Sequence, residues 1–180
     1  FPWTPNRTNV PTTYRGSGEF YAEVDASMWT YMLAWGASHP LRFYDAPVLL
    51  PVANPLCAND PRLTEGIWTI PLFLTLPPVL AWGVALWLAL ALTAAASFYA
   101  GTMLTGSRWG GAAVAVLFSF GTFRANHVCH IEGIFAPFLA LALAAMARFL
   151  EEPGRRAAIL FALALAAATA TNATLAATEI

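Results

Sequence analysis

VLAWGVALWLALALTAAASFYAGTML, residues 79–104, contains no charged side chain. As an α-helix this stretch would rise about 39 Å at about 1.5 Å per residue, enough to cross a hydrocarbon core about 30 Å thick. Pro77 and Pro78 precede it and suit an entry turn better than a helix interior. A buried helix of a soluble protein is the alternative, but such helices are rarely this long without a charge. We therefore predict a transmembrane helix here.

The composition of the whole chain agrees with this prediction. Hydrophobic residues make up 58% of the 180 residues and charged residues only 11%, whereas a soluble domain carries about 25% charge. The formal net charge is -1 and no basic cluster is present, which argues against a nucleic-acid partner. Cys57 and Cys129 do not form a CxxC motif, so no zinc or redox site is indicated. A disulfide between them stays open and would need an oxidising compartment.

Three further apolar stretches follow, at residues 109–123, 131–150 and 156–178. The first is short for a crossing, at roughly 22 Å, and the other two are of spanning length. We predict an all-α integral membrane protein, in which residues 77–180 form a transmembrane helix bundle of about four spans. If residues 109–123 are re-entrant instead, the later loops change sides. Because the chain begins with Phe1 rather than Met, we expect a fragment of a longer membrane protein.

Residues 1–76 are predicted to form a long outer loop that carries two interfacial helices. Residues 1–24 are polar and rich in Pro and Gly, which favours irregular or extended structure. Asp25–Ala37 has the spacing of a short amphipathic helix with Asp25 as its N-cap. Arg62–Leu76 is predicted to form the second helix, after Asp60 as N-cap and Pro61 at the first helical position.

Charge in the short loops predicts the orientation of the bundle. With four crossings, the arginines of two loops fall on one side of the membrane, and the positive-inside rule makes that side cytoplasmic. These arginines are Arg108, Arg148, Arg155 and Arg156.

Glu23 and Asp25 are the first candidate functional residues. On an extended segment an E-x-D pair places both carboxylates on one side, where they could hold a metal ion or supply a general base. The competing interpretation is that Asp25 is only a helix N-cap and Glu23 is solvated.

The second group lies on the same predicted outer face, in the sequence Arg124–Glu132. Arg124, His127 and His130 could hold a phosphate, or the two histidines could bind a metal with Glu132, although the H-E-x-x-H order is absent. The alternative is a loop whose polar side chains meet only lipid headgroups. Glu65 lies in the opening turns of the second interfacial helix. A capping role, which explains Asp60, explains Glu65 less well.

The order of these motifs resembles a known class of membrane enzymes. EVDASMWTYMLAWG is followed by the proline-rich FYDAPVLLPVANPL, by RLTEGIWTIPLF, by the long span with its LTGSR turn, and by FRANHVCHIEGIFAPFLALAL. This series, which covers most of residues 20–155, is similar to GT-C-type glycosyltransferases and the related YfhO-like bacterial membrane proteins. The span that normally precedes the acidic loop and the later spans of that class are missing here.

The resemblance implies a multi-pass enzyme of the bacterial inner membrane that transfers a sugar from a polyprenyl-phosphate donor on the outer face. It implies that Asp25, with Glu23, acts on the acceptor as general base or through a divalent metal such as Mg²⁺ or Mn²⁺. Glu65, Arg124, His127 and His130 would contact the substrates, with the last three at the donor phosphate. The alternative is a non-enzymatic polytopic protein, either a transporter or flippase component or a structural subunit.

Overall fold

The computed structural model describes residues 18–40, 42, 63–125 and 131–171, and it does not describe the side chains of residues 18–25, 63, 64, 123, 125 and 132. Throughout these described residues the regular structure is helical and contains no strand. The helices are α1 (Gly18–Ser38), α2 (Leu63–Thr75), α3 (Pro78–Thr105), α4 (Arg108–Phe120), α5 (Thr122–Ala125), α6 (Ile131–Ile134), α7 (Pro137–Glu151) and α8 (Arg155–Thr171).

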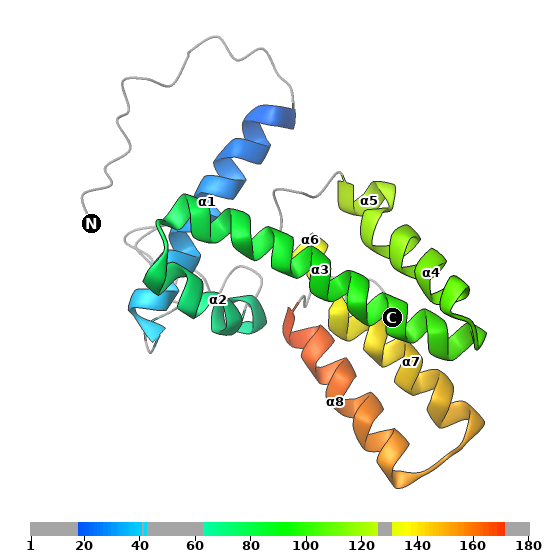
Figure 1. The fold of residues 1–180 in the computed structure, drawn as a ribbon. Helices are drawn as coiled ribbons and strands as arrows, with labels where there is room; N and C mark the ends of the chain where they lie inside the picture. Colours follow the sequence, from blue (N-terminus) through cyan, green and yellow to red (C-terminus); the bar gives the residue numbers. More distant parts are fainter. Residues whose placement is uncertain (1–17, 41, 43–62, 126–130, 172–180) are drawn as a thin grey trace, which may run out of the picture.

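The long helix α3 is the axis along which the other helices are arranged (Figure 1). Helices α1 and α2 pack together at its N-terminal end, and α4 and α7 pack along the remainder. Helix α4 returns antiparallel to α3, α7 runs parallel to α3, and α8 returns along α7. The α3–α4 turn and the α7–α8 turn therefore lie at the same end of the bundle, away from α1 and α2.

Local sequence explains where α3 begins and ends. Pro78 occupies the first turn, where a missing N–H costs nothing. The helix ends at Gly106, whose φ of 65° is the left-handed conformation that glycine adopts without penalty. Ser107 then caps α4, its side chain accepting a hydrogen bond from the Trp109 backbone N–H at 3.3 Å.

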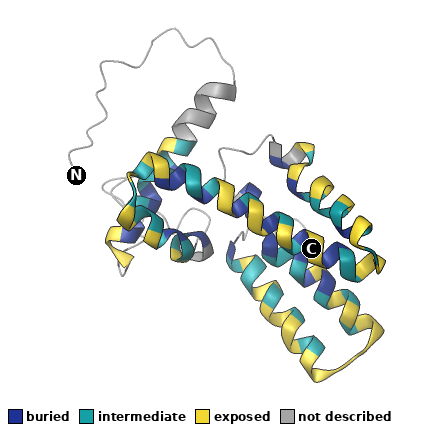
Figure 2. Ribbon diagram, viewed as in Figure 1, coloured by how far each residue is buried: buried dark blue, intermediate teal, exposed yellow. Residues whose placement is uncertain are grey.

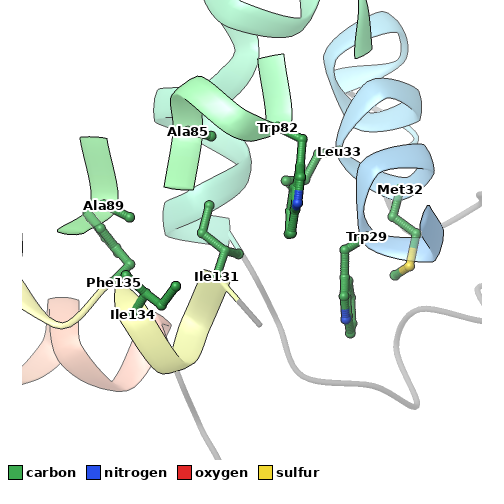
Figure 3. Packing of buried hydrophobic residues seen from close by; sticks show 9 residues of the cluster. All are labelled: Trp29, Met32, Leu33, Trp82, Ala85, Ala89, Ile131, Ile134 and Phe135. Carbon is green, nitrogen blue, oxygen red and sulfur yellow. The ribbon is translucent and has the colours of Figure 1, made fainter. Parts of the chain in front are cut away.

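A core of large apolar side chains joins α1 and α2 to the N-terminal half of α3. Trp29 and Leu33 of α1 pack with Trp82 of α3 and with Ile131 and Phe135 from the α6 region (Figure 3). Trp68, Leu72 and Phe73 of α2 pack against this cluster. Further along α3 the buried residues are small: the second cluster consists of Ala100, Ala140 and Ala144. The two ends of α3 are thus packed in different ways.

The helix predicted at residues 79–104 is confirmed to within one residue at each end, since α3 runs from Pro78 to Thr105, and its crossing of a membrane stays a prediction. It is the one helix in the described residues that is long and apolar enough to cross a membrane. The predicted span at 109–123 is interrupted at Gly121, where α4 has ended and α5 has not begun. The predicted span at 131–150 was wrong as a single helix, because Phe135 and Ala136 separate α6 from α7. Of the predicted span at 156–178, α8 covers residues up to Thr171 and the remainder lies outside the described residues.

The prediction for the first segment was only partly correct. The α1 helix begins at Gly18, seven residues earlier than expected, so residues 18–24 are helical rather than irregular and Asp25 is not an N-cap. The second predicted helix is present as α2, which continues through Pro71. Asp60 and Pro61, its expected first residues, lie outside the described part of the chain.

Candidate functional site

Arg124 is a buried cation that ties two helices together through their backbone carbonyls. Its side chain comes from α5 and is only 8% exposed. Nε donates a hydrogen bond to the Phe118 carbonyl oxygen in the last turn of α4, at 2.7 Å. Nη1 donates to the carbonyl oxygens of Gly133 and of Ile134, the latter at 3.3 Å. The guanidinium carbon also lies 4.5 Å from the centre of the Phe118 ring, a cation–π distance.

The acceptors of Arg124 explain why a charge is tolerated there. Carbonyls at the C-terminal ends of helices carry partial negative charge and have no partner within their own helix. Burial lowers the pKa of the Arg124 guanidinium because desolvation disfavours the charged form. Arginine nevertheless keeps its proton in proteins, so this side chain is a permanent cation and a five-proton donor rather than an acid–base group.

Thr93 completes the same junction from α3. Its hydroxyl donates to the Ile134 carbonyl oxygen at 2.8 Å and accepts from the Ala136 backbone N–H at 3.0 Å. Together, Arg124 and Thr93 satisfy the backbone groups that the break between α6 and α7 exposes. Sequence reasoning missed Thr93. The available signal was a threonine within an otherwise apolar span, since polar residues inside spans usually face other helices.

The structure therefore changes the interpretation of Arg124. The sequence made Arg124 a candidate to hold a donor phosphate, with a loop that meets only lipid headgroups as the alternative. Instead, Nε and Nη1 are engaged with backbone carbonyls, which makes Arg124 first of all a structural link between α4 and α6. The hydrogen bonds of Arg124 to described residues come from Nε and Nη1.

Glu65 lies in the first turn of α2 and is fully buried, at 0% exposure. Thr69, one turn later on the same face, donates its hydroxyl proton to the Glu65 backbone carbonyl at 2.6 Å. Leu72 continues this face and packs against the core shared with α1 and α3. A carboxyl group rarely occupies such a position unless an interaction compensates its burial. Glu65 is therefore a stronger candidate than its sequence position alone indicated.

The local conformation at Glu23 and Asp25 differs from the expected one. Both residues lie within α1, where residues two apart do not face the same side. The argument that an extended E-x-D pair presents both carboxylates together was therefore wrong. Their side chains lie outside the described residues, as do His127, His130, Cys57, Cys129 and the Glu132 side chain.

The described residues do not bring the predicted groups into one site. Arg124 lies in α5, beside α6, and Glu65 lies in α2. Both α6 and α2 contact α3. Among the described side chains no three of His, Cys, Asp and Glu gather as metal ligands, and the residues proposed to bind a metal are not among them. The metal site stays a prediction.

Comparisons with protein-family models, curated proteins and solved structures give no match to this chain. The similarity to GT-C-type enzymes therefore rests on the order of the sequence motifs described above.

Proposed function

We propose that the chain is an integral membrane protein in which α3, α4, α7 and α8 form a helix bundle surrounded by lipid. The observation that carries this proposal is the inverted burial of α3. Buried and exposed residues alternate along α3 (Figure 2). Its buried residues are mostly small or polar, and most of its exposed ones are large and apolar. The buried set is Ala81, Trp82, Ala85, Ala89, Thr93, Ser97, Ala100 and Gly101; the exposed set includes Val79, Leu80, Trp87, Leu88, Leu92, Phe98 and Leu104.

A soluble core helix would have the opposite distribution. Only 28% of the most apolar window of α3 is buried, whereas the core helix of a soluble domain is enclosed on most sides. Exposed large residues also occur on the neighbouring helices, for example Leu117 on α4 and Leu163 on α8. Contiguous apolar surface of this extent is rare on soluble monomers, and lipid is the solvent that it suits.

The contact between α3 and α4 supports the same conclusion. Gly101 and Gly111 allow the two backbones to approach so closely that a Cβ on Gly101 would lie 2.7 Å from Val114 Cβ. Small residues at such contacts are characteristic of helix association in membranes, where lipid removes the hydrophobic driving force and packing must replace it.

Extraction from membranes tests the proposal. The protein is expected to stay in the membrane pellet after an alkaline carbonate wash and to be released only by detergent. A peripheral protein known to wash off serves as the control in the same membranes. Release of the chain by carbonate would overturn the proposal of an embedded bundle.

For the activity, we propose sugar transfer from a polyprenyl-phosphate donor at the face where α1 and α2 lie. This proposal rests on the motif resemblance. It is supported by the position of the buried Glu65 on α2, which packs against α1, the helix in which Glu23 and Asp25 precede the packed residues. Glycosyl transfer needs a base for the acceptor and positive charge for the departing phosphate. We assign the first role to Asp25 and the second to the Arg124–His130 segment, including His127.

The assignment of Asp25 predicts that Asp25→Ala in the full-length protein abolishes release of polyprenyl phosphate from a sugar-charged donor. Glu152→Ala, in the exposed turn after α7, is the matched control and should retain activity. Release at the wild-type rate by Asp25→Ala would remove the assignment. Absence of release by the wild-type protein would favour the non-enzymatic alternative, a transporter or flippase component or a structural subunit.

A further inference from the structure

Two strongly exposed tryptophans lie at different positions along the axis of the bundle, one within α3 and one at the start of α4. Trp87, in α3, is 73% exposed, and Trp109, at the start of α4, is 87% exposed. Tryptophan is enriched where a membrane protein passes from hydrocarbon to headgroups, because its ring is apolar and its N–H is polar. Most of each side chain is exposed, so packing inside the bundle does not account for either tryptophan. We therefore use the two residues as markers of depth in the membrane.

The distance between the two markers matches the thickness of a bilayer. From Trp87 to Thr105, where α3 ends beside Trp109, the helix rises about 27 Å at about 1.5 Å per residue, close to the hydrocarbon thickness of about 30 Å. The whole of α3 would rise about 42 Å by the same measure. The helix α3 is therefore longer than the hydrocarbon is thick. Either one end of α3 extends beyond the hydrocarbon or the whole helix is strongly tilted.

The charges identify the end that lies at Trp109 as one membrane boundary. Arg108 precedes Trp109, and the α7–α8 turn at the same end of the bundle is rich in charge (Figure 1). The charged residues of that turn are Arg148, Glu151, Glu152, Arg155 and Arg156. The whole of α3, from Pro78 to Thr105, has no charged residue, so the charges mark only the boundary at Trp109.

The packing along α3 changes near the other marker. As far as Leu90 on α3 the core contains large side chains such as Trp29, Trp82 and Ile131, as in a protein folded in water (Figure 3). At Ala100 and beyond, the contacts are between alanines of α3 and α7, as in a membrane bundle. The two types of core imply two different surroundings.

We propose that hydrocarbon covers α3 only from Trp87 to Thr105, and that its first turns stand outside the hydrocarbon together with α1 and α2. This placement rests on the proposed membrane embedding and specifies its boundaries. The exposed apolar corner where α2 meets α3 then rests on the lipid headgroups. Its residues are Ile67, Leu74, Val79 and Leu80.

The break between α6 and α7 is compatible with this placement. It lies beside Thr93, about 9 Å along α3 from Trp87 at about 1.5 Å per residue. Non-helical backbone at hydrocarbon depth is tolerated only where protein buries it and satisfies its polar groups. Residues 133–137 are all buried, and Thr93 bonds the Ile134 carbonyl and the Ala136 N–H.

Spin labels on α3 test the boundary directly. Single cysteines replace Leu80, Leu92 or Phe98, all exposed on α3, in the full-length protein with Cys57→Ala and Cys129→Ala. The labelled proteins are reconstituted in phosphatidylcholine–phosphatidylglycerol vesicles. Collision with oxygen, which concentrates in hydrocarbon, is compared with collision with a water-soluble nickel complex. Labels at exposed Leu163 and Glu152 serve as the lipid and water controls.

The expected result is that labels at 92 and 98 collide with oxygen and not with nickel, while the label at 80 collides with nickel. A label at 80 as protected as the one at 92 would overturn the boundary at Trp87 but leave the membrane bundle intact. Nickel access at all three positions would overturn the bundle itself. Any other combination of accessibilities at positions 80, 92 and 98 would also contradict the boundary at Trp87.

Discussion

At the scale of single residues, Arg124 shows how a charge can be explained by the backbone rather than by a ligand. Its nitrogens reach carbonyls of α4 and α6, two elements that the sequence separates by an undescribed segment. Sequence reasoning identified Arg124 as important but not for this reason. Backbone carbonyls have no sequence signature, so an arginine that faces a phosphate and one that faces carbonyls look alike until the fold is known.

This role predicts a large effect of Arg124→Met on stability. The variant would leave buried carbonyls of Phe118, Gly133 and Ile134 without the charged donor. A hydrogen bond to a charged group is worth about 1.5–3 kcal/mol, so we expect a loss of about 3 kcal/mol or more. Unfolding of the full-length protein in mixed detergent micelles would measure it.

The matched control is Arg148→Met, which removes an exposed arginine near the α7–α8 turn and should change stability by no more than about 0.5 kcal/mol. Equal effects of the two substitutions would mean that the Arg124 contacts contribute no stability. If Arg124→Met keeps its stability yet loses sugar transfer, the phosphate role would be favoured over the structural one.

At the scale of elements, the α3–α4 hairpin depends on Gly101, on Gly111 and on the turn between the two helices. A Cβ at Gly111 would collide with the Thr102 hydroxyl and would lie 2.7 Å from the Phe98 carbonyl oxygen, an atom of the helix backbone that cannot move aside. At Gly83, in α3, a Cβ would meet nothing within 4 Å. Gly111 therefore has no room for a Cβ, whereas Gly83 does.

We therefore predict that Gly111→Ala destabilises the protein and Gly83→Ala does not. Overpacking typically costs about 1–3 kcal/mol, whereas alanine in place of a helical glycine with room for a Cβ gains up to about 1 kcal/mol. Thermal unfolding of the two variants in the same detergent compares them. A Gly111→Ala protein as stable as Gly83→Ala would show that the close approach of α3 and α4 is not needed.

The elements also show which parts of the fold were accessible from sequence. The bounds of α3 followed from an uncharged stretch between two prolines and a glycine turn, all local signals. The break before α7 had a signal as well, since Pro137 suits the first position of a new helix, but the apolar run across it concealed the interruption. The early start of α1 had no comparable signal, because Gly16 and Gly18 indicated a loop.

At the scale of the whole molecule, the large-residue core at one end of α3 and the alanine contacts at the other indicate two environments in one chain. Composition predicted a membrane protein, since 11% charged residues is well below the share of about 25% in soluble domains. It could not predict how the helices divide between water and lipid, because that depends on contacts such as Trp29 with Trp82 between distant segments.

The same arrangement predicts the orientation of the molecule in a cell. The α3–α4 and α7–α8 turns share one end and carry Arg108, Arg148, Arg155 and Arg156, while the C-terminal end of α1 lies at the opposite end of α3 (Figure 1). Because arginine-rich short loops stay on the cytoplasmic side, cysteine at Ser38 should react with a membrane-impermeant maleimide in intact cells. Cysteine at Glu152 should react only after permeabilisation.

Both positions are exposed, so lack of reaction at Glu152 in intact cells reports the membrane barrier, with permeabilised cells as the control for reactivity. The native Cys57 and Cys129 are replaced by alanine to leave one thiol per protein. Labelling of both positions from outside would place both ends of α3 on one side, which a spanning α3 forbids. Labelling of Glu152→Cys alone would invert the bundle, and the face that carries α1 and α2 would then be unable to meet a donor on the outer side.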